Sequence, residues 1–381
     1  MVSARLRRWV AMGTVATLVS LAAPLFLLWL ASPGTTPAIV DAAGRPVPGA
    51  LAEIRYPVIG GLAQFVLIRG RDPDAPILLL LHGGPGDAQA AMFRRYNSGL
   101  EDHFVVVHWD QRGAGASFSP EIPVETMTEE RILADTHELT LWLKRRFRRS
   151  RIFLLGHSWG SYVGLRTAAR HPCDYFAYVG VGQVADQKRS EAESYDFVSR
   201  RARELGNVKA VRELERIGRP QEGWYAGGLR AFATERRWVR EFGGAAHGLG
   251  NRETLLLFGL PLLRFPAYTM VQKMRYLQAE AFSMNALEEA MLRFDLAGKI
   301  RRVDLPVFFF QGRYDQQTVT SVARDYFDEL EAPHKEFILF EESAHLVPYE
   351  EPDRFEQVLV ERVRPLRAEP PPQRCSPNPS P

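Results

Sequence analysis

The sequence has little cysteine and almost no net charge. Its two cysteines are Cys173 and Cys375, and the second lies in a tail with six prolines within residues 370–381, a composition that predicts disorder. We therefore expect no structural disulfide between them, and the cysteine content does not indicate a redox compartment. The 48 Lys and Arg residues against 45 Asp and Glu leave a net charge of +3, too small to suggest a nucleic-acid-binding protein.

No internal repeat is present in the sequence. The composition is 46% hydrophobic and 24% charged, as in ordinary globular proteins. A chain of 381 residues is long enough for one large α/β domain that carries an insertion.

Charge is also absent from a long segment near the N-terminus. Arg5, Arg7 and Arg8 precede residues 10–30, which contain no charged side chain. A helix of that length rises about 30 Å, the thickness of a bilayer core. We expect residues 10–30 to be an uncleaved transmembrane anchor, with residues 1–9 cytoplasmic and the rest on the extracytoplasmic side. A signal peptide is the alternative, although residues 30–34 make a poor cleavage site.

Short apolar runs alternate with helix-compatible segments along most of the remaining chain. After a linker at 31–50, a hairpin of residues 51–57 and 62–69 around Gly60-Gly61 is expected. Buried strands are expected at 77–81, 104–109, 152–155, 175–181, 306–310 and 337–340, and a helix at 129–147. This pattern predicts an α/β fold with a mostly parallel sheet. We assign its core to residues 51–182 and 303–365, a helical cap to 183–302 and a disordered tail to 366–381.

The motif Gly156-His157-Ser158-Trp159-Gly160 lies between a predicted strand and a predicted helix. In this context G-x-S-x-G predicts a nucleophile elbow, where strained backbone exposes the serine hydroxyl. Side chains at positions 156 and 160 would clash at such a turn. Ser158 is therefore our candidate nucleophile.

A serine nucleophile needs a general base and an acid that orients the base. Asp315 follows the predicted strand 306–310, and His345 follows 337–340. Both follow Ser158 in the order Ser, acid, His that this fold class uses. We predict that His345 is the base and that Asp315 holds its tautomer.

Two backbone amides are expected to form the oxyanion hole. One is the amide of Trp159, and the other belongs to Gly83 or Gly84, in the glycine-rich loop after strand 77–81. Asp110 and Arg112 are expected to form an ion pair that braces a neighbouring loop.

Several motifs together resemble the proline iminopeptidase family of α/β-hydrolases. They are His-Gly-Gly-Pro-Gly (82–86), Asp-Gln-Arg-Gly within 110–117, the elbow (156–161), Gly312 to Asp315, and residues 343–345 with Glu351-Pro352. The resemblance covers roughly residues 55–182 and 303–362. It implies a serine hydrolase that removes an N-terminal residue, often proline, from short peptides without a cofactor or metal. Family members hold the substrate ammonium with acidic cap side chains, for which Glu191 and Glu193 are candidates here.

We therefore expect a membrane-anchored serine hydrolase, most readily an aminopeptidase acting on a small molecule or short peptide. An esterase, lipase or acylase for an apolar acyl substrate is the alternative. A non-catalytic binding protein with the hydrolase fold is a third possibility. Dehalogenase and epoxide hydrolase chemistry is disfavoured because those relatives attack with a carboxylate where this chain has Ser158.

Overall fold

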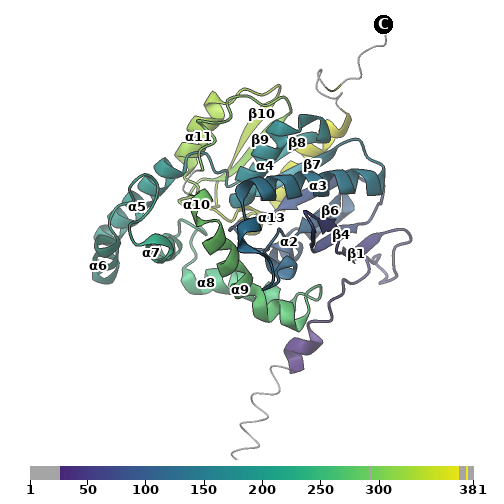
Figure 1. Ribbon diagram of the computed structural model, residues 1–381, viewed down its shortest axis with the longest axis horizontal. Helices are drawn as coiled ribbons and strands as arrows, with labels where there is room; N and C mark the ends of the chain where they lie inside the picture. Colours follow the sequence, from purple (N-terminus) through teal and green to yellow (C-terminus); the bar gives the residue numbers. More distant parts are fainter. Residues whose placement is uncertain (1–25, 292–293, 369–374, 376–381) are drawn as a thin grey trace, which may run out of the picture.

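An eight-stranded sheet forms the centre of the protein, for which we use a computed structural model (Figure 1). The structure describes residues 26–291, 294–368 and 375. The strand order is β1-β4-β6-β5-β7-β8-β9-β10, in which β4 runs antiparallel to β1 and β6 and the remaining neighbours are parallel. The strands are β1 (Leu51–Arg55), β4 (Val66–Gly70), β5 (Ile77–Leu81), β6 (Val105–Trp109), β7 (Ile152–His157), β8 (Tyr175–Val181), β9 (Val307–Gly312) and β10 (Lys335–Phe340).

In place of the one N-terminal hairpin expected from the sequence, the structure contains two separate strand pairs. β1 pairs with β4, while β2 (Val58–Ile59) and β3 (Leu62–Ala63) form a separate short hairpin between them. Gly60 and Gly61 make its turn with φ angles of 56° and 80°, which glycine adopts without steric cost.

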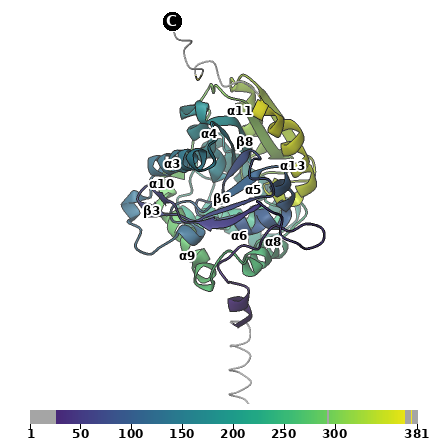
Figure 2. The same cartoon turned by 90° about the vertical axis from the view of Figure 1, so that its right-hand side faces the viewer.

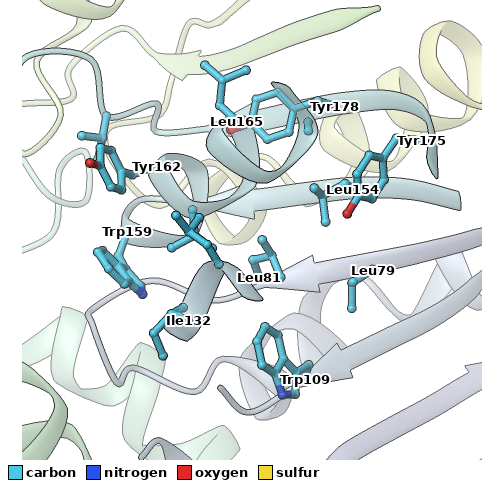
Figure 3. Close-up of a cluster of buried hydrophobic side chains, with 14 of the residues drawn as sticks. Leu79, Leu81, Trp109, Ile132, Leu154, Trp159, Tyr162, Leu165, Tyr175 and Tyr178 are labelled. Atoms are coloured by element: carbon cyan, nitrogen blue, oxygen red, sulfur yellow. The ribbon is translucent and has the colours of Figure 1, made fainter. Parts of the chain in front are cut away.

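Helices cover both faces of the sheet, so the inner strands β5, β6, β7, β8 and β9 are buried on both sides, whereas the edge strands β1 and β10 are mostly half-buried. Leu79 and Leu81 pack with α3 (Glu129–Phe147), α4 (Trp159–Arg170) and α11 (Thr320–Glu329). Figure 3 shows this cluster, in which Trp159, Tyr162 and Leu165 of α4 lie beside strand residues such as Leu154. Leu78 and Leu80 face the opposite layer, which contains α2 (Ala90–Tyr96) and α13 (Pro352–Val358). Successive side chains of these inner strands point to opposite faces, and both faces are buried, so nearly every position of the strands is apolar.

The register of the parallel strands brings their carboxyl ends together. Leu81 pairs with Gly156, Gly156 with Gly180, and Val181 with Phe310. Phe340 pairs with Gly312 at the end of the next strand pair. The segments that follow β5, β7, β8, β9 and β10 therefore start at one edge of the sheet, where open α/β sheets bind ligands.

An insertion between β8 and β9, called the cap below, covers part of this edge. Tyr276 of α9 donates a hydrogen bond to the Ala88 carbonyl at 2.7 Å, and Ser283 of α9 donates to the Gly113 carbonyl at 3.0 Å. The cap helices are α5 (Gln187–Glu204), α6 (Val208–Ile217), α7 (Gly228–Glu241), α8 (Asn251–Arg264), α9 (Met270–Ala286) and α10 (Glu288–Met291). The short elements outside the cap are η1 (Ser98–Asp102), η2 (Gly115–Ser117), η3 (Val124–Thr126), η4 (Pro172–Asp174), α12 (Val347–Glu350), η5 (Leu359–Val363) and η6 (Arg364–Ala368).

Most of the expected transmembrane anchor lies outside the described residues. Residues 26–30 are helical, whereas residues 10–25 are not described. Within the part of the chain that the structure describes, no helix combines the length and the apolar character needed to cross a membrane.

The expectation that the two cysteines stay unpaired is wrong. Cys173 in η4 forms a disulfide with Cys375, although 202 residues separate them in the sequence. The expected tail at 366–381 also starts as a helical turn, because η6 continues to Ala368. A proline-rich composition removes regular secondary structure, but it does not prevent one residue of the segment from bonding to the domain. The other tail residues, 369–374 and 376–381, lie outside the described residues.

Candidate active site

Ser158 occupies the sharp turn between β7 and α4. Its backbone has φ 54° and ψ −120°, a strained conformation for a residue with a side chain, and its side chain is half-buried. Its N–H donates to the Val181 carbonyl at 2.9 Å, which fixes the turn against the end of β8. Strain at this position matches the geometry predicted for a nucleophile elbow.

The two glycines of the motif are required by close backbone contacts. A Cβ on Gly156 would lie 2.1 Å from the Gly160 carbonyl oxygen. A Cβ on Gly160 would lie 2.1 Å from the carbonyl oxygen of Leu81. The turn therefore packs against the end of β5 with no room for a side chain, as the sequence predicted.

Asp315 and His345, which come from different strand ends, form a buried pair. Nδ1 of His345 lies 2.8 Å from Oδ2 of Asp315. The Asp315 carboxylate also accepts hydrogen bonds from the hydroxyl of Thr318 at 2.7 Å and from Gln311 Nε2 at 3.0 Å. Its other oxygen accepts the backbone N–H groups of Gln317 and Thr318 at 2.8 and 3.0 Å.

These partners keep Asp315 ionised inside the protein. Burial by itself raises the pKa of the carboxyl, but the His345 charge and the hydrogen bonds from His345 and Thr318 outweigh burial. The pKa of Asp315 therefore lies below its usual value. An ionised carboxylate at Nδ1 holds the histidine in the tautomer whose Nε2 is free to accept a proton.

Ser158 and His345 lie on neighbouring segments of the strand-end edge. A Cβ on Gly182 would lie 2.9 Å from Cε1 of His345, and Gly182 follows the Val181 carbonyl that binds the Ser158 amide. Among the described residues, no hydrogen bond joins the Ser158 hydroxyl to the ring of His345. In enzymes without substrate such bonds are often long or misaligned and shorten in the complex.

The glycine-rich loop lies against Ser158. A Cβ on Gly83 would lie 3.3 Å from the Cβ of Ser158, so the backbone of residue 83 contacts the turn. Gly84 has φ 105°, and a Cβ there would lie 2.6 Å from the amide nitrogens of Gly86 and Asp87. Trp159 is the first residue of α4, and a helix supplies no intrahelical acceptor to its first N–H groups.

Gln111 ties this loop to the elbow. Its N–H donates to Nε2 of His82 at 3.0 Å, its Nε2 donates to the His82 carbonyl, and its Oε1 accepts from Trp159 Nε1 at 2.9 Å. Burial lowers the pKa of His82 to about 4, so the ring is neutral and its Nδ1–H donates to the Gly83 carbonyl at 2.9 Å. The glycine loop is thus held by uncharged hydrogen bonds.

The expected ion pair between Asp110 and Arg112 is not formed. Arg112 binds Asp135 of α3, with Nε 2.8 Å from Oδ2, and both side chains are buried. Asp110 instead accepts from the Tyr268 hydroxyl at 2.6 Å and the Ala116 amide at 2.8 Å, and burial raises its pKa to about 7. The sequence suggested a local pair because Asp110 and Arg112 are near neighbours with opposite charges. The observed partner of Arg112 is Asp135, which α3 brings to it.

Two residues that the sequence reasoning did not single out hold His345. Nε2–H of His157 donates to the carbonyl of His345 at 2.9 Å, and burial lowers the pKa of His157 to about 3, so this ring is neutral. One carboxylate oxygen of Glu350 accepts the amides of Ala344 and Leu346 at 3.1 and 3.0 Å. The backbone on both sides of the candidate base is therefore fixed.

An acidic pair lies where α9 of the cap meets the glycine loop. A Cβ on Gly86 would lie 3.1 Å from the Cα of Glu280, which places Glu280 beside Asp87. Burial and the charge of Asp87 raise the pKa of Glu280 to about 7, although Arg240 opposes the shift. Both side chains are half-buried, so the pair concentrates negative charge without being sealed from solvent.

Glu191 and Glu193 have other partners. Glu191 is fully buried and pairs with Arg236, and its carboxylate also accepts from Gln187 at 2.8 Å. Glu193 is partly exposed on α5, where it accepts a hydrogen bond from the hydroxyl of Ser321 of α11 at 2.8 Å. The period of α5 could not distinguish these two environments, because the burial of Glu191 depends on α7, which supplies Arg236.

One side-chain cluster has metal-ligating residue types. Ligand atoms of His137, His171 and Asp174 lie within 4.8 Å of one another. The His137 and His171 rings stack at 3.5 Å, and the Lys144 ammonium binds Asp174. His171 and Asp174 flank the start of β8, opposite the strand ends that carry Ser158. The lysine already neutralises the carboxylate, so we assign this cluster no metal.

The fold and this arrangement agree with comparisons to known proteins. Residues 78–358 match the sequence model of the alpha/beta hydrolase family, and the chain belongs to that family. Within it the chain is proline iminopeptidase-like. It is 32% identical over 325 residues to the probable aminopeptidase YbaC of Bacillus subtilis, covering 84% of this chain and 98% of that protein.

Two further similar proteins are described as proline iminopeptidases. A probable proline iminopeptidase of Streptomyces coelicolor is 34% identical over 105 residues, which cover 26% of this chain and 31% of that protein. The crystal structure of proline iminopeptidase from Mycobacterium smegmatis superposes with a TM-score of 0.56 at 18% identity. It covers 81% of this chain and 96% of that chain, and at this identity the likeness concerns the fold.

Proposed function

We propose that this hydrolase is a serine aminopeptidase of the proline iminopeptidase type, with Ser158 as nucleophile. The Asp315–His345 pair carries the proposal, because it lies at the same strand-end edge as the strained Ser158 turn. The Ser158 oxygen attacks the substrate carbonyl carbon while Nε2 of His345 takes the hydroxyl proton. The resulting oxyanion accepts hydrogen bonds from the Trp159 amide and from the Gly83–Gly84 segment.

The remaining steps use the same groups. His345 returns the proton to the leaving amine, and the scissile C–N bond breaks to give an acyl-enzyme. Water then attacks the ester carbonyl while His345 accepts a proton from it, and the proton returns to Ser158 as the carboxylic acid leaves. Asp315 stays ionised and stabilises the imidazolium in both halves of the reaction.

Recognition of a free N-terminus is assigned to Asp87 and Glu280 in place of Glu191 and Glu193. The support is their position beside the glycine loop, together with the commitment of Glu191 to Arg236. A substrate ammonium between two carboxylates replaces their mutual repulsion with attraction. The similarity to the probable aminopeptidase of Bacillus subtilis favours the same substrate class.

The activity is tested with a panel of substrates on the purified protein. Prolyl and other aminoacyl naphthylamides with a free amine should be turned over, and N-acetylated versions should not. Turnover of p-nitrophenyl esters alone would replace the peptidase assignment with the esterase or acylase alternative. Loss of all turnover in Ser158→Ala is expected in either case.

For location, we propose that residues 10–30 anchor the protein and that the hydrolase domain lies outside the cytoplasm. Support comes from the charge-free run behind Arg5, Arg7 and Arg8, and from the Cys173–Cys375 disulfide, since disulfides persist in oxidising compartments. A reporter fused after Pro381 should be extracytoplasmic. A cytoplasmic reporter would overturn this orientation.

A further inference from the structure

The cap contains a helix that is apolar on every side but is scarcely buried. Residues 254–263 of α8 read Thr-Leu-Leu-Leu-Phe-Gly-Leu-Pro-Leu-Leu, and Thr254 is the only buried residue of the helix. Leu255 is 71% exposed. One side of α8 packs on the domain through Leu257, Phe258 and Leu262, whereas its other side is exposed. A helix without a polar face normally lies in a protein core or in a membrane, so an exposed apolar side requires a partner.

Exposed apolar side chains continue from α8 onto two neighbouring segments. Lys273 of α9 joins them, because its ammonium donates to the Leu263 carbonyl of α8 and to the Ala31 carbonyl, both at 2.8 Å. Figures 1 and 2 both show α8, α9 and the purple helical segment 26–30 together at the lower end of the molecule. We call this surface the apolar patch; its residues are Phe26, Leu27, Trp29, Leu30, Leu255, Leu256, Leu260, Leu263, Val271, Met274 and Leu277.

We propose that the apolar patch docks into a lipid bilayer, with α8 and α9 lying in its interface. The chain that enters the patch at Phe26 comes from residues 10–25, which carry no charge, so the sequence continues the apolar surface. Arg252, Arg264 and Arg275 are exposed on the same two helices, where they can meet anionic headgroups. Apolar side chains with flanking cations are the composition of helices that lie in a membrane interface.

Docking in this way sets the distance between the bilayer and the candidate site. The outer face of α9 presents Met274 and Leu277 to the patch, while Tyr276 and Ser283 contact the loops at Ala88 and Gly113. One helix therefore separates the glycine loop from the proposed lipid surface. The inference rests in part on the proposed anchor, because residues 26–30 belong to both, but it does not depend on the proposed catalytic activity. Probes on α8 and α9 report on the patch itself and not on the anchor.

The test places a fluorescent probe on the patch of the full-length protein in vesicles of phosphatidylcholine and phosphatidylglycerol. Both native cysteines are in the disulfide, so a thiol-reactive nitrobenzoxadiazole probe labels only an introduced cysteine. Leu255→Cys and Leu277→Cys change side chains that are 71% and 74% exposed, so the fold should tolerate them. Asp328→Cys on α11, which is exposed and lies at the opposite end in both views, is the matched control.

Lipids carrying a doxyl group near the headgroup should quench the probes at 255 and 277 by about half, since interfacial helices bury only 5–10 Å deep. The probe at 328 should be unaffected. Equal, weak quenching at all three positions would overturn the proposal. Protection from water at 255 and 277 without lipid quenching would overturn it too, because it would indicate that a second copy covers the patch.

Discussion

Glu280→Gln is the change that separates recognition of the substrate amine from the chemistry at Ser158. The substitution removes the charge and keeps the shape of the side chain. Glu280 lies beside Asp87 at the glycine loop, so its loss should weaken binding of a free ammonium. A hydrogen bond to a charged group contributes about 1.5–3 kcal/mol, which corresponds to roughly a 10- to 100-fold loss in kcat/KM for free-amine substrates.

The pH dependence gives this prediction a sharper form. Burial and Asp87 raise the pKa of Glu280 to about 7, so the carboxylate that we propose to bind the ammonium forms as the pH rises through 7. The ratio of kcat/KM for an aminoacyl naphthylamide to that for a blocked ester cancels any pH dependence of the steps that both substrates share. In the wild type this ratio should rise from pH 6 to about 7.5, before the substrate amine loses its proton near pH 8. In Glu280→Gln the ratio should be low and flat.

Steady-state kinetics on both substrates from pH 5.5 to 8 measure the effect. Glu193→Gln is the matched control, because Glu193 is a partly exposed cap glutamate with partners on α5 and α11. It should leave the ratio unchanged. The reasoning is refuted if Glu280→Gln lowers kcat/KM equally for the free-amine substrate and the blocked ester. It is also refuted if the wild-type ratio of the two kcat/KM values does not change across pH 7.

Three further substitutions test the supports of the site and the stability of the domain. His157→Ala removes the hydrogen bond to the His345 carbonyl and should lower kcat about 10- to 100-fold with little change in KM, as steady-state kinetics will show. Gly160→Ala puts a Cβ 2.1 Å from the Leu81 carbonyl oxygen, so both the activity and the midpoint temperature of thermal unfolding should fall. A variant with wild-type activity and midpoint temperature would contradict this contact. Cys375→Ser removes the disulfide and should lower the free energy of unfolding, measured with denaturant, by about 2–5 kcal/mol. Equal denaturant midpoints for the variant and the wild type would show that the bond does not stabilise the domain.

The features of the site that could be predicted from the sequence are those that depend on the backbone of a tight turn and on where strands end. Gly156 and Gly160 are required by the turn itself, and the strand ends before Asp315 and His345 were visible as apolar runs. Parallel strands bring such ends to one edge whatever their separation in sequence. The pairing of Asp315 with His345 follows from that rule.

The remaining features depend on how distant segments pack, which periodicity does not encode. Glu280 lies near Asp87 only because α9 packs on the glycine loop, and Arg112 pairs with Asp135 because α3 covers that face of the sheet. Likewise, nothing in the sequence around Cys375 indicates that it forms a disulfide with Cys173. The cap glutamates chosen from sequence, Glu191 and Glu193, lie at positions that the cap uses for other contacts.

The central claim is that Ser158, activated by His345 and Asp315, forms the covalent intermediate. The most direct measurement is mass spectrometry of the protein after reaction with a fluorophosphonate. We predict one phosphonyl group on the peptide that contains Ser158, a rate of labelling reduced by orders of magnitude in Asp315→Asn, and none in Ser158→Ala. Labelling of another serine, or undiminished labelling of Ser158→Ala, would contradict the account.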